Sequence, residues 1–376
     1  MARKPSRNLA AVVMAAGKGK RLKSRLPKVL HPVCGRPTLW HVLLAVAEVR
    51  PDRVIVVVAH ESDQVEEAVR SWDLGLPIQF VDQGDPLGTG HAVMVTESSV
   101  GRVEDVLVVS GDEPLVTGDE LRDLLAIHRR KKASATVQTT LAPGIRGLGH
   151  VVRDGDAFEK IVEAPRSTEH AAHIPEVATG VYAFRREDLF KALPLLSRDN
   201  RQKEYYLVDV LGILKEKGER IVVQQVDHGG SVGTNSRTEL AAASAVMRRR
   251  INEALMEHGV TLVDPDRTYV DVSVKVGPDT VIHPLTFLEG ETVIGRDCVI
   301  GPSTRVADST VGDEVEIQFS VVREATIRSR VTVGPYAHLR PEAVLEEGSK
   351  AGTFVEIKKS TVGKGSKVPH LAYVGD

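Results

Sequence analysis

The strongest constraint on the fold is a six-residue repeat in the C-terminal third of the chain. From about residue 270, an aliphatic residue recurs every six positions, and a small residue follows each one four positions later. The aliphatic positions are Val276, Ile282, Leu288, Ile294, Ile300 and Val306, and the small ones are Thr280, Thr286, Thr292, Cys298, Thr304 and Thr310. This period fits neither a helix face nor a simple strand alternation, but it is typical of a hexapeptide β-helix. The aliphatic side chains would fill a triangular coil, and the small ones would lie near its corners.

The repeat slips by one residue at Val311 and returns at Val333, Leu339 and Leu345. The sequence stops at Gly375-Asp376, a dipeptide that also occurs within the repeat at residues 312–313. Because the ends of solenoids normally carry a cap, we expect the chain to be truncated relative to the natural protein.

The N-terminal part of the chain, up to about residue 235, has a different pattern. Short β-branched runs alternate with amphipathic segments, which predicts βαβ units and a doubly wound α/β sheet. The strands are expected at residues 9–16, 53–59, 78–81 and 106–109, and the helices at 38–48 and 62–72. One further helix is expected over 236–258, with Ser236 and Glu239 as a capping box and Gly259 as its stop. The pattern thus predicts a domain over 1–235, a linker helix over 236–260 and an incomplete β-helix domain over 261–376.

Composition excludes several classes of protein. Lys plus Arg is 49 and Asp plus Glu is 51, a balance that argues against binding to nucleic acid or to an anionic membrane. Two cysteines cannot form a disulfide framework, and no segment has the pattern of a signal peptide or a membrane span. We therefore expect a cytoplasmic protein whose partners are small molecules.

A glycine-rich loop follows the first predicted strand. Gly17 and Gly19 permit tight backbone and close approach to a ligand, and Arg21 and Lys28 add positive charge. The spacing matches neither a Walker A loop nor a dinucleotide-binding fingerprint. The residues predict a phosphate site, and the alternative is a basic surface loop after a strand.

These residues resemble a known family. A-A-G-x-G-x-R followed by P-K is similar to the signature of sugar-1-phosphate nucleotidyltransferases. Together with the six-residue repeat, the chain resembles the bacterial bifunctional N-acetylglucosamine-1-phosphate uridylyltransferase/glucosamine-1-phosphate acetyltransferases. Further matches lie at residues 87–92, 111–115, 204–206 and 365–371. The resemblance implies a left-handed parallel β-helix after a nucleotidyltransferase domain, a homotrimer, and Mg²⁺-dependent transfer of UMP from UTP to N-acetylglucosamine-1-phosphate. The product, UDP-N-acetylglucosamine, is a peptidoglycan precursor.

The resemblance also assigns roles to single residues. It makes Asp112 and Asn235 the protein ligands of Mg²⁺, and Arg21 and Lys28 the groups that neutralise the triphosphate. It gives uracil recognition to Gln83, Gly88 and Thr89. Other expected substrate-binding positions are Met14, Ala15, Ala16, Gly17, Ser110, Gly111, Gly149, Glu163 and Ala178. The alternatives are a turn-forming role for Asp112, helix capping for Asn235 and an ordinary strand-end role for Gln83.

The sugar-binding positions depart from the family pattern. Ala178 stands where the family usually has Asn, Val208 where it usually has Thr, and His150 where an Arg is common. Loss of two side-chain hydrogen bonds would weaken binding or change the preferred sugar phosphate, unless waters replace them. Two alternative functions follow: nucleotidyl transfer to another sugar-1-phosphate or from dTTP, and a trimeric scaffold that binds nucleotide without turnover.

The β-helix carries the second activity of the family, acetyl transfer from acetyl-CoA. Arg340, Lys358, His370 and Tyr373 match its sugar-phosphate and catalytic positions, with His370 as the base. The later turns that supply acetyl-CoA contacts are absent, and Pro369 replaces the usual Gly. We therefore expect no productive acetyl transfer by this chain.

The remaining histidines and cysteines show no metal-binding spacing. His31, His41, His60 and His91 are scattered and predict structural or surface roles rather than a zinc site. Cys34 and Cys298 are expected to be buried small residues.

Overall fold

A computed structural model of the chain describes residues 8–59, 62–142, 149–163, 174–200, 202–227 and 233–375. The chain forms two compact units. The N-terminal unit consists of Met1–Val33 and Pro37–Ala243, and the C-terminal unit of Cys34–Arg36 and Ser244–Asp376. The division falls within one long helix, α8 (Arg237–Glu257). The domain borders that the sequence suggests therefore remain predictions.

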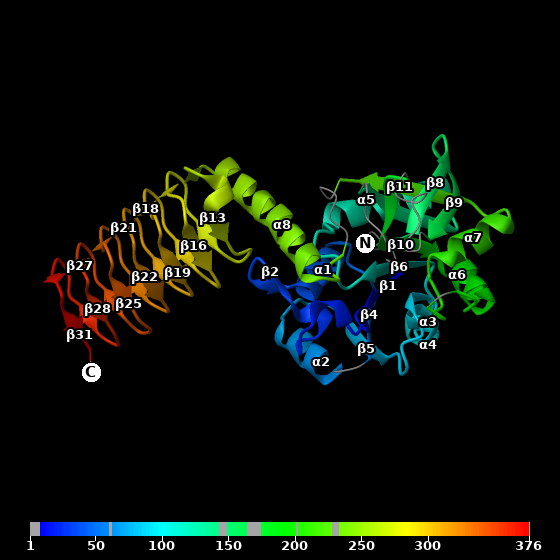
Figure 1. The fold of residues 1–376 in the computed structure, drawn as a ribbon, viewed down its shortest axis with the longest axis horizontal. Coiled ribbons are helices and arrows are strands. Elements are labelled where there is room, and N and C mark those ends of the chain that lie inside the picture. Colours follow the sequence, from blue (N-terminus) through cyan, green and yellow to red (C-terminus); the bar gives the residue numbers. More distant parts are fainter. Residues whose placement is uncertain are drawn as a thin grey trace, which may run out of the picture. The chain divides into compact units, whose positions relative to one another are not determined.

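A mixed sheet forms the centre of the N-terminal unit (Figure 1). Its main strands lie in the order β11-β7-β10-β6-β1-β4-β5. Their bounds are β1 (Leu9–Met14), β4 (Arg53–Val58), β5 (Ile78–Asp82), β6 (Asp105–Ser110), β7 (Ala135–Leu141), β10 (Glu176–Arg185) and β11 (Ile221–Val226). The four strands expected from the sequence are confirmed, and β1 pairs in parallel with both β4 and β6. In contrast, β10 runs antiparallel to β6 and β7, so the sheet is not wholly parallel.

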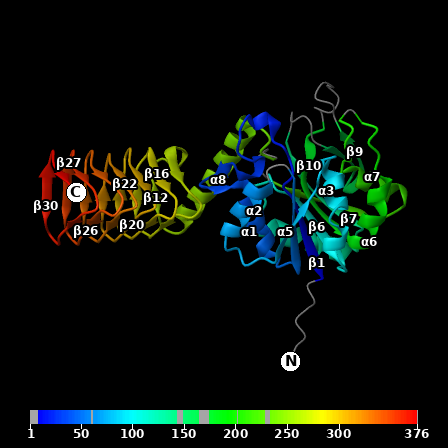
Figure 2. The ribbon, with the colours of Figure 1, turned by 90° about the horizontal axis from the view of Figure 1, so that it is seen from below.

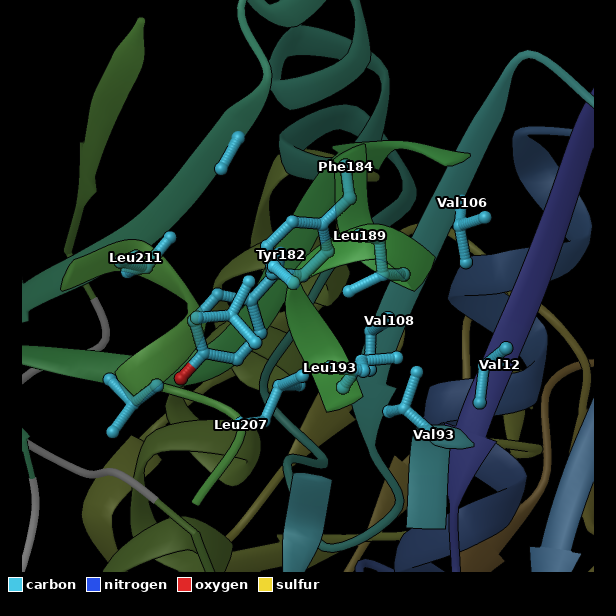
Figure 3. Packing of buried hydrophobic residues seen from close by; sticks show 14 of the residues in the cluster. Val12, Val93, Val106, Val108, Tyr182, Phe184, Leu189, Leu193, Leu207 and Leu211 are labelled. Atoms are coloured by element: carbon cyan, nitrogen blue, oxygen red, sulfur yellow. The ribbon is translucent and has the colours of Figure 1, made fainter. Parts of the chain in front are cut away.

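Successive side chains of the central strands point to opposite faces of the sheet and pack into two hydrophobic layers, one on each face. Val13 and Val109 pack with helices of one face, whereas Val12 and Val108 pack with helices of the other, as Figure 3 shows for the second layer. The first face carries α1 (Thr38–Glu48), α2 (Ser62–Ser71) and α5 (Gly118–Lys131). The second carries α3 (Thr89–Met94), α4 (Glu97–Val100), α6 (Arg186–Ala192) and α7 (Asp209–Glu216). Burial on both faces explains why these strands read as continuous apolar runs.

The strand order defines where a ligand would bind. The chain runs from β1 to β4 and β5 on one side, then returns to place β6 on the other side of β1. Such a reversal opens a crevice beyond the carboxyl ends of the two strands, where ligands bind in open α/β sheets. Here that crevice lies beyond Met14 and Ser110, which are register partners.

Helix α8 begins and ends near the residues expected from the sequence. The Ser236 hydroxyl accepts a hydrogen bond from the backbone N–H of Glu239 at 3.2 Å. The Glu239 carboxylate reaches back to the N–H of Asn235 at 2.7 Å, one residue before the cap rather than at it. Gly259, at φ +88°, follows the last turn and stops the helix.

The C-terminal unit is a parallel β-helix, consistent with a left-handed one. Its short strands stack coil upon coil in three parallel sheets (Figure 2). The first sheet contains β12 (Thr261–Leu262), β15 (Val281–Ile282), β18 (Val299–Ile300), β21 (Glu316–Ile317), β24 (Thr332–Val333), β27 (Lys350–Thr353) and β30 (Lys367–His370). The second contains β13 (Thr268–Val270), β16 (Thr286–Glu289), β19 (Arg305–Ala307), β22 (Val321–Arg323), β25 (His338–Leu339), β28 (Glu356–Ile357) and β31 (Tyr373–Val374). The third contains β14 (Lys275–Val276), β17 (Val293–Ile294), β20 (Thr310–Val311), β23 (Thr326–Ile327), β26 (Val344–Leu345) and β29 (Thr361–Val362).

The residues of the repeat lie as predicted, with one correction. Most of the aliphatic positions are fully buried inside the coil, while Val276, at its first turn, is partly exposed. Among the small positions, Thr310 is exposed and Ser309 is buried in its place. The Ser309 hydroxyl donates to the Ala307 carbonyl at 2.7 Å and accepts from the Ala325 N–H at 3.1 Å, which closes the corner one residue early. The slip therefore occurs before Ser309, not at Val311.

No helix within the described residues is long and apolar enough to cross a membrane.

A buried ionic cluster lies at the amino-terminal end of β6. The Asp105 carboxylate, 6 % exposed, accepts a 2.6 Å hydrogen bond from Arg129 Nε and lies 3.6 Å from His128 Nε2. Burial acts to raise the pKa of Asp105, but the hydrogen bonds and charges of His128 and Arg129 outweigh it and lower that pKa. A carboxylate with a lowered folded-state pKa stabilises the fold above its ordinary pKa, and that stabilisation is lost as the pH falls through the folded-state value.

We expect Asp105→Asn to lower the free energy of unfolding by about 2 kcal/mol at pH 7, because hydrogen bonds to charged groups are lost. The difference from the unsubstituted protein should shrink as the pH falls below the ordinary aspartate value of 3.8. Urea unfolding at a series of pH values measures both quantities. A difference that stays constant down to the acid limit would contradict this account of Asp105.

Candidate active site

A cavity of about 550 Å³ opens in the crevice beyond β1, β5 and β6. The residues that line it come from three loops and one distant turn. They are Met14, Ala16, Gly17, Lys18, Lys20, Lys28, Val29, Gln83, Asp85, Pro86, Leu87, Gly88, Thr89, Ala92, Ser110, Asp112 and Glu204. The loops after β1 and β5 supply most of the wall, as the strand order requires.

The glycine-rich loop forms the basic side of the cavity. Gly19 adopts φ +57°, and a Cβ placed there would lie 2.7 Å from the Lys28 Cβ, so only glycine lets the loop lie against Lys28. Gly17 has no such conflict, because its Cβ would be 3.8 Å from the Lys28 side chain. Lys18, Lys20 and Lys28 all line the cavity. Three lysines among the lining residues suit a ligand with several phosphates.

Arg21 differs from the expectation. It is not among the residues that line the cavity, and its guanidinium lies 4.0 Å from the Glu239 carboxylate with nearly half of the side chain exposed. Lys18 and Lys20, which the sequence analysis did not single out, occupy the wall instead. Their positions beside Gly17 and Gly19 in the sequence could have indicated that they line the cavity.

Asp112 and Asn235, far apart in sequence, meet at Lys28, and both Lys28 and Asp112 line the cavity. The Lys28 ammonium forms an ion pair with Asp112 Oδ2 and a 2.6 Å hydrogen bond with Asn235 Oδ1, and both partners in the pair are largely buried. A Cβ on Gly233, at φ +64°, would lie 3.3 Å from Asp112 Oδ2 and 3.0 Å from Asn235 Nδ2. Two side-chain oxygen atoms thus converge on one cationic group, and such a donor set fits a hard divalent cation such as Mg²⁺.

The local geometry also argues against the alternative roles, which were turn formation for Asp112 and helix capping for Asn235. Ser236, not Asn235, caps helix α8 with its side chain. The Thr234 hydroxyl donates to the Asp112 carbonyl at 3.2 Å, which ties the turn before α8 to the turn after β6. The Asp112 carboxylate faces Lys28 rather than its own turn.

Glu113 is a buried carboxyl group that the sequence analysis missed. It is 5 % exposed, and its Oε1 lies close to Gly233. Burial and the neighbouring Asp112 raise its pKa well above the usual value, although a hydrogen bond from the Gly233 backbone opposes this. Nothing in the sequence distinguishes Glu113 from an exposed turn residue.

The loop after β5 forms the second wall of the cavity. Gln83 is buried, and its Nε2 donates to the Gly88 carbonyl at 3.0 Å. The Thr89 hydroxyl accepts from the N–H of Leu207 at 2.9 Å, and the N–H of Gly90 donates to the Tyr205 carbonyl at 2.8 Å. The segment around Tyr205 therefore holds the loop in place, which gives a structural reason for its presence beside this site.

The remaining positions near the loops fall into two groups. Met14, Ala16 and Ser110 line the cavity, whereas Ala15 and Gly111 are buried and are not among its lining residues. The N–H of Gly111 donates to the Met14 carbonyl at 2.9 Å, which fixes the two strand ends together. The binding roles of all five residues stay predictions.

The expected sugar-binding residues lie in an apolar patch outside the cavity lining. Gly149 begins strand β8 (Gly149–Asp154), and the register of β8 with β10 places it opposite Ala178. A Cβ on Gly149 would lie 3.3 Å from Val208 Cγ2 and 3.0 Å from Ile161 Cγ2. Ala178 and Val208 are both buried in the same hydrophobic cluster. Glu163 pairs with Gly149 at the end of β9 (Ala157–Glu163), and its side chain lies outside what the structure describes.

The β-helix residues matched to acetyl transfer lie in two places. Arg340 and Lys358 follow neighbouring strands of the second sheet, and Tyr373 lies in its next strand. Arg340 forms a 2.8 Å ion pair with Glu356. His370 is exposed in the first sheet and lines a cavity of about 620 Å³ that has none of the other three among its lining residues. The catalytic role of His370 and the substrate-binding roles of the other three residues stay predictions.

The scattered histidines and the two cysteines noted in the sequence lie, where the structure describes them, in buried or partly buried positions. His41 Nε2 is 2.8 Å from the Val33 carbonyl, His31 is buried, and His60 lies outside the described residues. Cys298 is buried, while Cys34 is only partly buried, and its pKa is raised to about 11, chiefly by burial and then by the charge of Asp271. Among the residues that the structure describes, no three His, Cys, Asp or Glu side chains form a metal-binding group.

Comparison with known proteins identifies the family. Residues 11–207 match the model of the MobA-like NTP transferase domain. The bifunctional protein GlmU of Listeria monocytogenes serotype 4b is 44% identical over 369 residues, which cover 97% of this chain and 80% of that protein. The bifunctional protein GlmU of Halalkalibacterium halodurans is 42% identical over 372 residues, covering 98% and 81%.

Solved structures share the fold of about two thirds of the chain. A putative glucose-1-phosphate thymidylyltransferase from Bacillus anthracis superimposes with a TM-score of 0.53 at 18% identity, covering 63% of this chain and 94% of that chain. A UDP-glucose pyrophosphorylase in complex with UDP-glucose gives the same TM-score and identity, covering 64% and 98%. From the sequence relatives and the domain match together, the chain belongs to the GlmU family and is a nucleotidyltransferase.

Proposed function

We propose that the N-terminal unit transfers UMP from UTP to N-acetylglucosamine-1-phosphate with the help of Mg²⁺, releasing pyrophosphate. Synthesis of UDP-N-acetylglucosamine by uridylyl transfer is the activity that membership in the GlmU family assigns to this chain. The observation that carries the site assignment is the meeting of Asp112 and Asn235 at one cationic position beside the glycine-rich loop.

Positioning and charge stabilisation are the main tasks of the site in this reaction. The phosphate oxygen of the sugar phosphate is already anionic, so its attack on the α-phosphorus of UTP needs no general base. When bound, Mg²⁺ neutralises charge on both substrates and holds them together. If Asp112 and Asn235 held Mg²⁺, the Lys28 ammonium would be available to the triphosphate, together with Lys18 and Lys20, which line the same cavity. Arg21 would have to leave Glu239 to join them.

A second candidate substrate rests on the apolar patch around Gly149. Ala178 and Val208 offer no side-chain hydrogen bond there, and both are buried. A sugar-1-phosphate without the N-acetyl group, such as glucose-1-phosphate, would lose less binding free energy from the presence of Ala178 and Val208 at these positions. The reaction type is unaffected, because the residues of the nucleotide cavity are separate from the patch.

For the C-terminal unit, we propose assembly into a homotrimer without productive acetyl transfer. A column of exposed apolar side chains on successive coils supports an assembly: Tyr336 stacks on Phe354 at 5.3 Å between ring centroids, and Phe319 lies 5.6 Å from Tyr336. His370 lies in a different sheet from Arg340 and Lys358 and directly follows Pro369, where the family usually has Gly, and this supports the absence of productive acetyl transfer. The cytoplasm remains the proposed compartment, on the basis of two unpaired cysteines.

A turnover panel tests the proposal. UTP, dTTP and GTP are each incubated with N-acetylglucosamine-1-phosphate, glucosamine-1-phosphate and glucose-1-phosphate, and pyrophosphate release is measured with Mg²⁺ and with excess chelator. We expect release from UTP with one or more of the sugar phosphates and none with chelator. Release only with glucose-1-phosphate would favour the second candidate. Tight UTP binding without turnover on any sugar phosphate would overturn the enzymatic assignment.

A further inference from the structure

The Gln83 side chain presents an amide to the cavity whose orientation is fixed by two neighbours. Gln83 follows β5, is buried and is one of the residues that line the cavity. Its Nε2 is 3.0 Å from the Gly88 carbonyl oxygen and 3.3 Å from His91 Nδ1. A carbonyl oxygen can only accept, so the atom that faces Gly88 must be the NH₂ group, and this fixes which way the amide points.

The contact with His91 completes the assignment. An amide nitrogen has two hydrogens and no lone pair available to accept, so Gln83 Nε2 must donate to His91 as well as to Gly88. His91 Nδ1 therefore accepts, and the imidazole carries its proton on Nε2. Both hydrogens of the NH₂ group are then in use. Oε1, which accepts no hydrogen bond from any described residue, is the only polar atom of the Gln83 side chain left for a ligand.

From this geometry we propose that His91 is a positioning residue that makes Gln83 an acceptor only, so that the cavity selects a pyrimidine that donates from N3. The inference rests on the proposed nucleotidyl transfer at this site. Uracil and thymine carry a hydrogen on N3 and can donate to Oε1. Cytosine has a lone pair on N3, which would face another acceptor and leave a buried polar atom unpaired. His91 thus sets the base preference without itself lining the cavity.

The position of His91 suits this role. It lies on α3 (Thr89–Met94), the helix that begins at the loop which carries Gly88, and it is half-buried. Gly88 adopts φ +107°, and a Cβ there would lie 2.5 Å from the Tyr205 carbonyl oxygen, so the carbonyl that orients Gln83 is itself fixed. If the His91 ring is removed, only the Gly88 carbonyl still holds the Gln83 amide, so turning the amide to present its NH₂ group to an acceptor such as cytosine N3 breaks one hydrogen bond instead of two.

The test compares UTP with CTP in two variants of His91. In His91→Leu, the ratio of kcat/KM for UTP over CTP should fall about tenfold, through KM rather than kcat, because one hydrogen bond distinguishes the bases. In His91→Asn, the side-chain oxygen can replace Nδ1 as acceptor, and the ratio should stay within about threefold of the unsubstituted enzyme. Met94→Leu, on the same helix, is the matched control for effects on packing.

Two outcomes would overturn the role of His91. One is an equal loss for UTP and CTP in His91→Leu with an unchanged ratio, which is the result of a purely structural role. The other is a His91→Asn variant that loses the preference as fully as His91→Leu. Equilibrium binding of UTP and CTP, measured by calorimetry, gives the same ratio without turnover. If the enzyme binds UTP in a His91-dependent way but turns over no sugar phosphate, the proposed reaction fails and the role of His91 stands.

Discussion

Replacing Asp112 by asparagine is expected to lower kcat/KM for pyrophosphate release by about 10³-fold, with the fold retained. The substitution keeps the size of the side chain but removes the negative charge that pairs with Lys28. A neutral amide holds a divalent cation much less well than a carboxylate, so the concentration of Mg²⁺ at half-maximal rate should rise as well. Steady-state kinetics over a range of Mg²⁺ concentrations measures both effects.

The matched control for Asp112 is Asp119→Asn. Asp119 is an exposed carboxylate in the first turn of α5, paired with Arg122, and is not among the residues that line the cavity. It should leave both kcat/KM and the Mg²⁺ requirement unchanged. An Asp112→Asn variant with kcat/KM within tenfold of the unsubstituted enzyme would mean that the Asp112–Asn235 pair is not the cation site.

The second large effect is expected from Gly88→Ala. The new Cβ would lie 2.5 Å from the Tyr205 carbonyl oxygen and 2.9 Å from the Glu204 Cβ, and the backbone stays at φ +107°. Both the overlap and the positive φ cost free energy, each about 1–3 kcal/mol. The loop can relieve the overlap only by moving away from Tyr205, which displaces Gln83 and Thr89. We expect KM for UTP to rise at least tenfold, as measured by initial rates at varied UTP.

Gly84→Ala distinguishes the effect of steric overlap from the effect of positive-φ strain on KM for UTP. Gly84 also has a positive φ, at +67°, but no atom lies within 4 Å of the position that its Cβ would take. It therefore carries the backbone strain without the overlap. If Gly84→Ala raised KM for UTP as much as Gly88→Ala, strain in the loop, not contact with Tyr205, would explain the loss.

Several features of the site were predictable because they depend on local sequence. The buried strands 9–14 and 105–110 appear as continuous apolar runs, and ligand-binding loops follow such strands. Lys28 and Asp112 stand next to these loops, so their proximity to one cavity follows from the strand order. Arg21 shows the limit of this reasoning, because a charged side chain in a loop takes whichever partner lies nearest, here Glu239 of α8.

The corner at Ser309 shows the same limit in the β-helix. Sequence periodicity alone makes Thr310 and Ser309 equally acceptable, since both are small and both carry a hydroxyl group. The pairing of β17 with β20 and the hydrogen bond from Ala325 decide between them. A one-residue shift in a coil is a matter of inter-strand register, which involves residues of neighbouring coils.

The amino-acid sequence by itself determined the two architectures. A period of six residues and an alternation of apolar strands with amphipathic helices are both patterns of residues close together in the sequence. Tertiary structure alone decided which polar atoms face each other: Asn235 with Lys28, His91 with Gln83, and Glu113 with Gly233. The first and last of these pairs join residues more than 100 positions apart in the chain, and all three depend on side-chain directions that only packing fixes.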